Sequence, residues 1–196
     1  MIASIEGKIA EKNPTFVVIE CNGIGYQVNV SLNTYSQISD SSSVKLLTHL
    51  VVREDAQILY GFAKEEEREL FRNLISVSGV GPNTARMILS SMSVNEIRLA
   101  IVNKDISTLQ SIKGIGSKTA QRIIVDLKDK IEKAGVLAEE NLGSTDNTIR
   151  DEALSALVML GYNKAIAQKT ISLVIKQRSG NIPTVEQLIK EVLKNA

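Results

Sequence analysis

Two stretches decide the fold: Val77-Ser78-Gly79-Val80-Gly81-Pro82-Asn83-Thr84-Ala85 and Ile112-Lys113-Gly114-Ile115-Gly116-Ser117-Lys118-Thr119-Ala120. They belong to an internal repeat, because aligning Leu74–Leu89 with Leu109–Ile124 matches Leu, Ser, both glycines, Thr, Ala and one Ile. Duplication of this kind argues against chance. In each copy an apolar helical segment leads into Gly-aliphatic-Gly, and a second helix begins at once. The repeat therefore predicts a tandem helix-hairpin-helix domain.

Each hairpin is suited to bind an anion. Glycine permits positive φ and lacks the Cβ atom that would block close approach of a ligand. The first N–H groups of the following helix have no intrahelical partner and attract negative charge. We therefore predict that both hairpins bind DNA phosphates without reading base sequence. The predicted contacts are Gly79, Val80, Gly81, Gly114, Ile115, Gly116, Lys118 and Thr119.

The distribution of charge supports this prediction. No acidic residue lies inside either hairpin window, whereas the windows and their flanks contain the basic residues Arg72, Arg86, Lys113, Lys118 and Arg122. The net charge of the whole chain is only +1, so binding must come from local patches. The alternative is that the glycines merely end helices in a packing unit. A Walker loop is excluded, because Ser117 rather than Gly precedes Lys118 and the preceding segment reads as helix.

The composition limits the other classes of function. The 196 residues are 43% hydrophobic, enough for more than one small core. The apolar runs are too short to span a membrane, and the N-terminus lacks the pattern of a signal peptide. The single Cys21 cannot form an internal disulfide, which favours a cytoplasmic location. His49 is the only histidine, so neither a zinc site nor a Ser-His-Asp triad is expected, and we predict no metal and no cofactor.

Residues 1–63 are expected to form a five-stranded, OB-like β-barrel. Alternating and β-branched segments predict strands over 3–9, 15–21, 25–30, 44–52 and 56–62, and Asn22-Gly23 is the clearest hairpin signal. The aromatic residues of this region are candidates for base stacking, but packing in the barrel or at its rim is favoured: Tyr26, Tyr35, Tyr60 and Phe62.

The rest of the chain is predicted to be helical, which makes the fold class α+β and multidomain. Residues 64–134 contain the paired hairpins, and Ser93 with Glu96 forms a capping box. Residues 135–147 have little apolar periodicity and are expected to be a flexible linker. Residues 148–196 predict a three-helix bundle, with a second capping box at Thr184, and a small tethered bundle of this kind typically binds a partner.

Two adjacent carboxylates, Glu54 and Asp55, lie between two apolar strands. Neighbouring side chains of a strand point to opposite faces, so this pair is poorly arranged to share a metal. A solvated turn is the simple interpretation. The functional alternative is that negative charge on a DNA-binding barrel repels phosphates and holds strands apart at a branch point.

The chain resembles the RuvA family of bacterial Holliday-junction branch-migration proteins over nearly its whole length. The resemblance lies in the turn Arg53-Glu54-Asp55, the following Tyr60-Gly61-Phe62, the two hairpins, and the tail motif Leu160-Gly161-Tyr162. It implies a non-catalytic subunit, active as a tetramer or a pair of tetramers, that holds a four-way junction in square-planar form. It also implies recruitment and stimulation of the hexameric ATPase RuvB through residues 148–196, with the RuvC resolvase as a further partner, in recombination and DNA repair.

The same resemblance assigns individual residues. Glu54 and Asp55 match the family's acidic pin, and the cations expected to support DNA binding are Lys118, Arg122 and Arg53. Asn83 departs from the pattern, because many relatives have a basic residue there, which predicts a weaker contact at the first hairpin. The alternative class is a helix-hairpin-helix repair nuclease or glycosylase, for which only Lys113 or Lys118 could be a nucleophile. A third class is a protein–protein adaptor.

Overall fold

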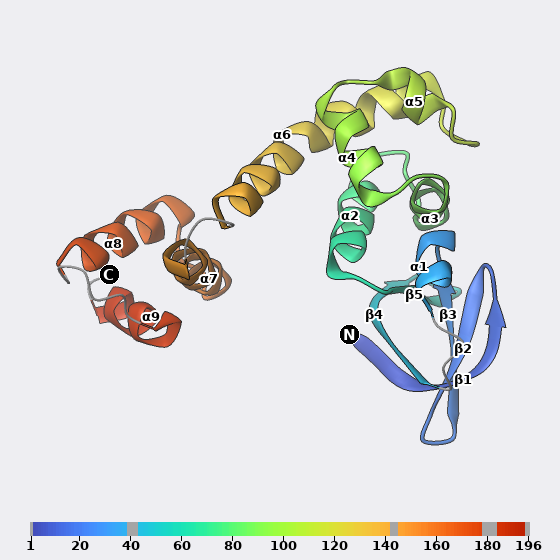
Figure 1. Cartoon of the computed structure of the whole chain (residues 1–196), viewed down its shortest axis with the longest axis horizontal. Coiled ribbons are helices and arrows are strands. Elements are labelled where there is room, and N and C mark those ends of the chain that lie inside the picture. Colours follow the sequence, from blue (N-terminus) through green and yellow to red (C-terminus); the bar gives the residue numbers. More distant parts are fainter. Residues whose placement is uncertain (1, 39–42, 142–144, 178–183, 195–196) are drawn as a thin grey trace. The chain divides into compact units, whose positions relative to one another are not determined.

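The computed structural model describes residues 2–38, 43–141, 145–177 and 184–194 (Figure 1). Its first part is a closed barrel of five strands, in the order β1-β2-β3-β5-β4, with β1 paired to β4. Within this barrel β3 and β5 run parallel, and the other neighbouring strands run antiparallel. The strands are β1 (Ser4–Asn13), β2 (Phe16–Cys21), β3 (Ile24–Val30), β4 (Ser43–Val52) and β5 (Gln57–Phe62). The predicted five-stranded OB-like barrel is confirmed.

Alternation of side chains along the strands fills the barrel. Val17 and Ile19 of β2 are fully buried, as are Val28 of β3 and Leu46 of β4. The β2–β3 connection is the predicted Asn22-Gly23 turn, in which both residues have positive φ, 50° and 83°. Positive φ at both central residues gives the twist that a two-residue hairpin needs.

A short helix, α1 (Leu32–Gln37), follows β3 and was not predicted from the sequence. Six residues are too few to show a helical period. Its start is set by Ser31, whose hydroxyl accepts a hydrogen bond from the N–H of Thr34. The side chain of Asn33 donates to the carbonyl oxygens of Leu89 and Met92, so α1 joins the barrel to the helices that follow.

Those helices contain the repeat. They are α2 (Glu65–Ile75), α3 (Pro82–Ser91), α4 (Val94–Val102), α5 (Ile106–Gln110) and α6 (Ser117–Asn141). The capping box of Ser93 and Glu96 is present at the start of α4. Phe71 of α2 is fully buried, with its ring centroid 5.0 Å from those of Tyr60 and Phe62 in β5. Strand β5 therefore contributes Tyr60 and Phe62 to the core of the hairpin helices, whereas the barrel interior has a core of its own. Both cores lie in the compact unit Met1–Glu132.

Helix α6 runs on to Asn141, so residues 135–141 of the expected linker have helical backbone. The reason is composition: Val136, Leu137, Ala138, Glu139 and Glu140 are compatible with helix, and Gly135 costs only about 1 kcal/mol. Residues 142–144 lie outside the described residues, and helix is present again from Thr145.

The second compact unit, Lys133–Ala196, contains the predicted three-helix bundle. Its helices are α7 (Thr145–Met159), α8 (Lys164–Gln177) and α9 (Val185–Lys194). Leu157 is fully buried in the bundle core, whereas Leu160 is 62% exposed and does not belong to the core. Gly161 ends α7 with a φ of 93°. Thr184 and Gln187 form the second capping box. Among the described residues, none of these helices is both long and apolar enough to cross a membrane.

Candidate nucleic-acid interface

The two hairpins have the same backbone geometry. Gly79 and Gly114 both have a φ of 90°. One residue later, the N–H of Val80 donates to Val77 O, and the N–H of Ile115 donates to Ile112 O, each at 3.0 Å. The sequence repeat is therefore a structural repeat, in which a glycine in the left-handed region turns the chain from one helix into the next.

The helices that follow also begin alike. The first helical hydrogen bond of α3 is donated by Ala85 to Gly81 O, and that of α6 by Ala120 to Gly116 O, both at 2.9 Å. The N–H groups ahead of these bonds have no helical acceptor. At the first hairpin the donors are Gly81, Asn83 and Thr84, since Pro82 has no N–H, and Gly81 provides no side-chain cap. At the second they are Gly116, Ser117, Lys118 and Thr119.

Val80 and Ile115 do not present donors of their own. Their side chains are only 4% and 6% exposed, and their N–H groups are used inside the turn. Their side chains pack in the core of the hairpin helices. Phosphate contact at Val80 and Ile115 stays a prediction, and the N–H groups without a helical acceptor lie one to four residues later in each repeat.

The second glycine of each hairpin leaves open space. A Cβ atom built on Gly81 or on Gly116 would meet no described atom within 4 Å. Gly81 has a φ of −80°, an angle that any residue adopts. Internal packing does not require glycine at either place. The missing side chain leaves open space beside the first free N–H groups, an arrangement suited to binding a phosphate.

Several cations lie at these hairpins. Lys113, Lys118 and Arg122 are exposed, and within the described part of the chain none of them pairs with a carboxylate. Arg86 differs, because its Nη1 donates to Thr15 O at 2.9 Å and to Asn29 Oδ1 at 3.3 Å. Arg86 therefore ties α3 to the barrel, and sequence reasoning, which counted it with the basic patch, did not separate these two roles.

Asn83 is held by the barrel. The hydroxyl of Tyr60, a residue only 2% exposed, donates to Asn83 Oδ1 at 3.1 Å. Burial raises the pKa of the Tyr60 hydroxyl, while Arg86 and Arg53 oppose that rise. The hydroxyl thus stays protonated and able to donate at neutral pH. Tyr60 and Phe62 are buried in the core, as the sequence favoured, and do not offer rings to a base.

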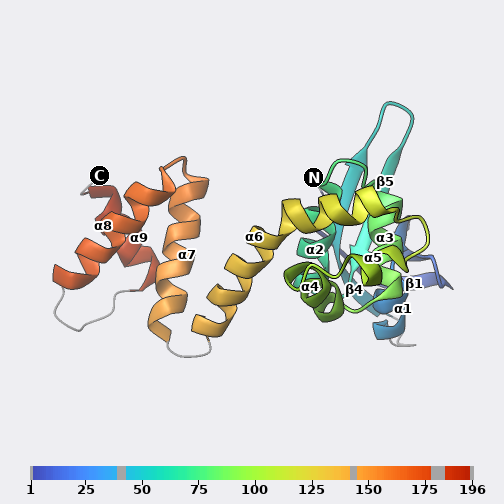
Figure 2. The ribbon, with the colours of Figure 1, turned by 90° about the horizontal axis from the view of Figure 1, so that it is seen from above.

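The acidic pair lies at the tip of the β4–β5 hairpin, which Figure 2 shows standing out from the barrel in teal. Arg53 N–H donates to Ala56 O at 2.8 Å and closes the turn, and Arg53, Glu54 and Asp55 are all exposed. The neighbouring Val52 is 65% exposed. In the described ranges, no group of three or more His, Cys, Asp or Glu side chains could hold a metal ion.

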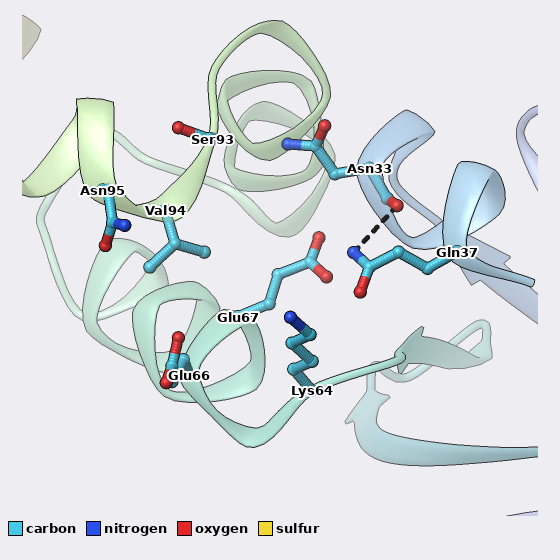
Figure 3. A pocket seen from close by; sticks show the side chains of 8 residues that line it. All are labelled: Asn33, Gln37, Lys64, Glu66, Glu67, Ser93, Val94 and Asn95. Atoms are coloured by element: carbon cyan, nitrogen blue, oxygen red, sulfur yellow. Dashed lines mark hydrogen bonds between the residues drawn. The ribbon is translucent and has the colours of Figure 1, made fainter.

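A pocket of about 230 Å³ lies away from the hairpins, between α1, α2 and the start of α4 (Figure 3). None of the predicted site residues lines it. Its notable member is Glu67, 3% exposed, which accepts hydrogen bonds from the hydroxyls of Ser31 and of Thr34, the latter at 2.6 Å. Burial raises the pKa of the Glu67 carboxyl, and these two hydrogen bonds offset part of the rise. Sequence reasoning missed Glu67, although it shares a helical face with Leu70, Phe71 and Leu74.

A small β-barrel, two helix-hairpin-helix units and a three-helix bundle follow one another along the chain. This order of domains places the protein in the class of multidomain helix-hairpin-helix proteins. Three family models match it: the RuvA N terminal domain over residues 1–61, the SAM-like helix-hairpin-helix tandem over 71–129, and the RuvA C-terminal domain over 148–196. The chain belongs to the RuvA family.

Relatives agree with this placement. The chain is 54% identical to a protein of Christiangramia forsetii over 195 residues, which is 99% of both chains. It is 50% identical to a protein of Cytophaga hutchinsonii, again over 99% of both, and 51% identical to one of Flavobacterium psychrophilum over the full length of both. Each of these three relatives is named as the RuvA subunit of the Holliday junction branch migration complex.

Proposed function

We propose that this protein is the junction-binding subunit of a Holliday junction branch migration complex. It is not itself an enzyme, and it acts in the cytoplasm, where it grips four-way DNA junctions through its two hairpins. The observation that supports this most directly is the pair of hairpins with equal φ, open space at the second glycine and free N–H donors. Such a site binds phosphate and has no group that reads a base edge.

Four copies suit a four-armed substrate. One chain has one pair of hairpins, and a pair of similar phosphate sites can follow the backbones of one duplex arm. A closed homotetramer with rotational symmetry would then supply one pair to each arm. A second tetramer on the opposite face of the junction would sandwich the DNA.

The acidic tip has a place in this arrangement. Glu54 and Asp55 are exposed on a projecting turn, and their charges repel phosphate. At the centre of a four-fold assembly, four such tips would keep the strands of the open junction apart. Arg53 beside them supplies a cation for the same strands.

The bundle of residues 148–196 recruits the motor ATPase RuvB. Its outer surface has apolar side chains that its small core does not use: Met159 is 87% exposed, Leu160 62% and Ile166 59%. These three side chains lie close together in the chain, at the end of α7 and the start of α8, which supports a docking surface there. The family assignment also decides against the alternative of a repair nuclease or glycosylase. RuvC resolvase is a further candidate partner at the open face of a single tetramer.

Gel shifts at fixed salt test the proposal. We expect the full chain to bind a four-way junction more tightly than a linear duplex made from the same arm sequences. Permuting the arm sequences should leave the affinity unchanged, because only phosphates are recognised. Equal affinity for junction and duplex would contradict the proposal, and so would a preference for one arm sequence.

A further inference from the structure

In each hairpin, the first glycine lies beside a side chain from the other copy of the repeat. A Cβ atom built on Gly79 would lie 3.8 Å from Arg122 Nη1, and one built on Gly114 would lie 3.4 Å from Met87 Cε. Met87 and Arg122 occupy the same position in the two copies of the repeat, as do Gly79 and Gly114. The side chain at this position therefore does not cover the glycine of its own hairpin. It reaches the glycine of the other hairpin.

The two side chains occupy equivalent positions in the repeat, but one is charged and the other is not. The first hairpin receives the guanidinium of Arg122 from the second repeat, and the second hairpin receives the uncharged Met87 from the first. At a second pair of equivalent positions the charge lies in the second hairpin: Lys118 is charged there, whereas its counterpart in the first hairpin, Asn83, is neutral. The second hairpin thus has lysines of its own, Lys113 and Lys118, where the first has Ser78 and Asn83. The first hairpin receives Arg122 from the other copy of the repeat.

Two other polar side chains at the first hairpin, Arg86 and Asn83, are already engaged. Arg86 donates to Thr15 O and Asn29 Oδ1 of the barrel. Asn83 Oδ1 accepts from the Tyr60 hydroxyl, which turns the acceptor atom of the amide toward the barrel and leaves its NH₂ as a neutral donor. Arg122 is exposed, and no carboxylate in the described residues pairs with it.

We propose that Arg122 is the phosphate-binding cation of the first hairpin, and that it takes the role for which Asn83 lacks the charge. This inference rests on the proposed function, because it concerns which hairpin each cation serves on the same DNA. It makes the two hairpins one composite site. Replacing Arg122, a residue of the second repeat, should therefore weaken phosphate binding by the first hairpin.

The test uses the full-length protein, a four-way junction, and the variants R122M, K118M, N83K, R122M/N83K and K118M/N83K. We expect R122M and K118M each to lower junction affinity by at least about tenfold, the usual effect of losing a hydrogen bond to a charged group. Each should also reduce the magnitude of the salt slope by about 0.9 per lost phosphate contact. Adding N83K should restore affinity and slope to R122M, because the new lysine lies at the same hairpin. It should not restore them to K118M.

Hydroxyl-radical footprinting distinguishes the hairpins directly. R122M should expose to cleavage the backbone sugars that G79V exposes, and K118M those that G114V exposes. The control is K128M, because Lys128 lies on the same helix and pairs with Glu132 at 3.4 Å. It should leave the footprint unchanged. Rescue of both single variants by N83K would overturn the inference, and so would exposure in R122M of the sugars that G114V exposes. If G79V and G114V also left binding and footprint unchanged, the proposed function itself would fail.

Discussion

The hydroxyl of Tyr60 donates a hydrogen bond to the side-chain oxygen of Asn83, 3.1 Å away, and so joins strand β5 of the barrel to the first residues of α3. Tyr60 also packs its ring against Phe71 at a centroid distance of 5.0 Å. Tyr60 thus connects strand β5, the core of the hairpin helices and the first hairpin.

Tyr60→Phe keeps the ring and removes only the hydroxyl. We expect a loss of about 1 kcal/mol in the free energy of unfolding, measured by urea titration, since one hydrogen bond is lost. Junction affinity should fall as well, because the Asn83 amide is released. Tyr26→Phe is the control, since within the described residues the Tyr26 hydroxyl has no hydrogen-bond partner. Equal effects of the two changes would show that the Asn83 contact contributes nothing.

Gly81→Ser should change the affinity for the junction without lowering the stability of the fold. Serine is a good N-cap residue, and its Cβ atom meets open space, so α3 should be as stable as before or up to about 0.5 kcal/mol more stable. The same side chain occupies the room in front of the N–H groups and competes for them. Junction affinity should therefore fall while the free energy of unfolding does not. Unchanged affinity in this variant would show that no phosphate enters the first hairpin.

Glu54→Gln combined with Asp55→Asn removes the charge of the pin. Junction binding should be as tight as before or tighter, because each removed charge relieves a repulsion of the order of 1 kcal/mol at about 4 Å from a phosphate in water. Strand separation at the junction centre, followed by fluorescence of a base analogue there, should decrease. Glu11→Gln, an exposed change elsewhere on the barrel, is the control. Abolished binding would mean that the two carboxylates have a structural role.

Glu67 should make stability depend on pH. Its pKa is raised in the folded protein above the reference value of 4.5, mainly by burial, so the folded state holds the proton more tightly than the unfolded state. The free energy of unfolding should therefore fall as pH rises from about 4.5 through the raised pKa, and level off above it. Urea titrations of wild type and Glu67→Gln isolate this effect. The difference between them should shift in favour of the variant across that window, and a constant difference would contradict the assignment.

Deleting residues 148–196 should leave junction binding intact, because both hairpins lie in the unit Met1–Glu132. Stimulation of the RuvB ATPase should be lost. The matched point variant is Met159→Glu, at a side chain that is 87% exposed and outside the bundle core. It should reduce capture of the motor while circular dichroism stays unchanged. Full stimulation by the shortened chain would place recruitment elsewhere.

The sequence predicted what depends on local pattern. The glycine hairpins, the strands and both capping boxes are short-range signals, and all are present. The strand expected over 3–9 runs on to Asn13, and the other strand bounds lie within one residue of the prediction. Helix α1 has too few residues to show a period. Helix α6 passes the expected boundary at 134 because a single glycine is a weak helix breaker. The pairing of Arg122 with Gly79 joins two copies of the repeat, and one-dimensional spacing contains no information on which copy faces which.

Val80 and Ile115 are buried, which anchors the turn of each hairpin to the core. A rigid site that recognises only phosphate gives nearly the same binding energy at every base-pair step. The free energy of the bound junction then changes little from one base-pair position to the next, so no position holds the junction back. On the function proposed above, the motor ATPase would then use its work to exchange base pairs, and the junction-binding protein would add little resistance to migration.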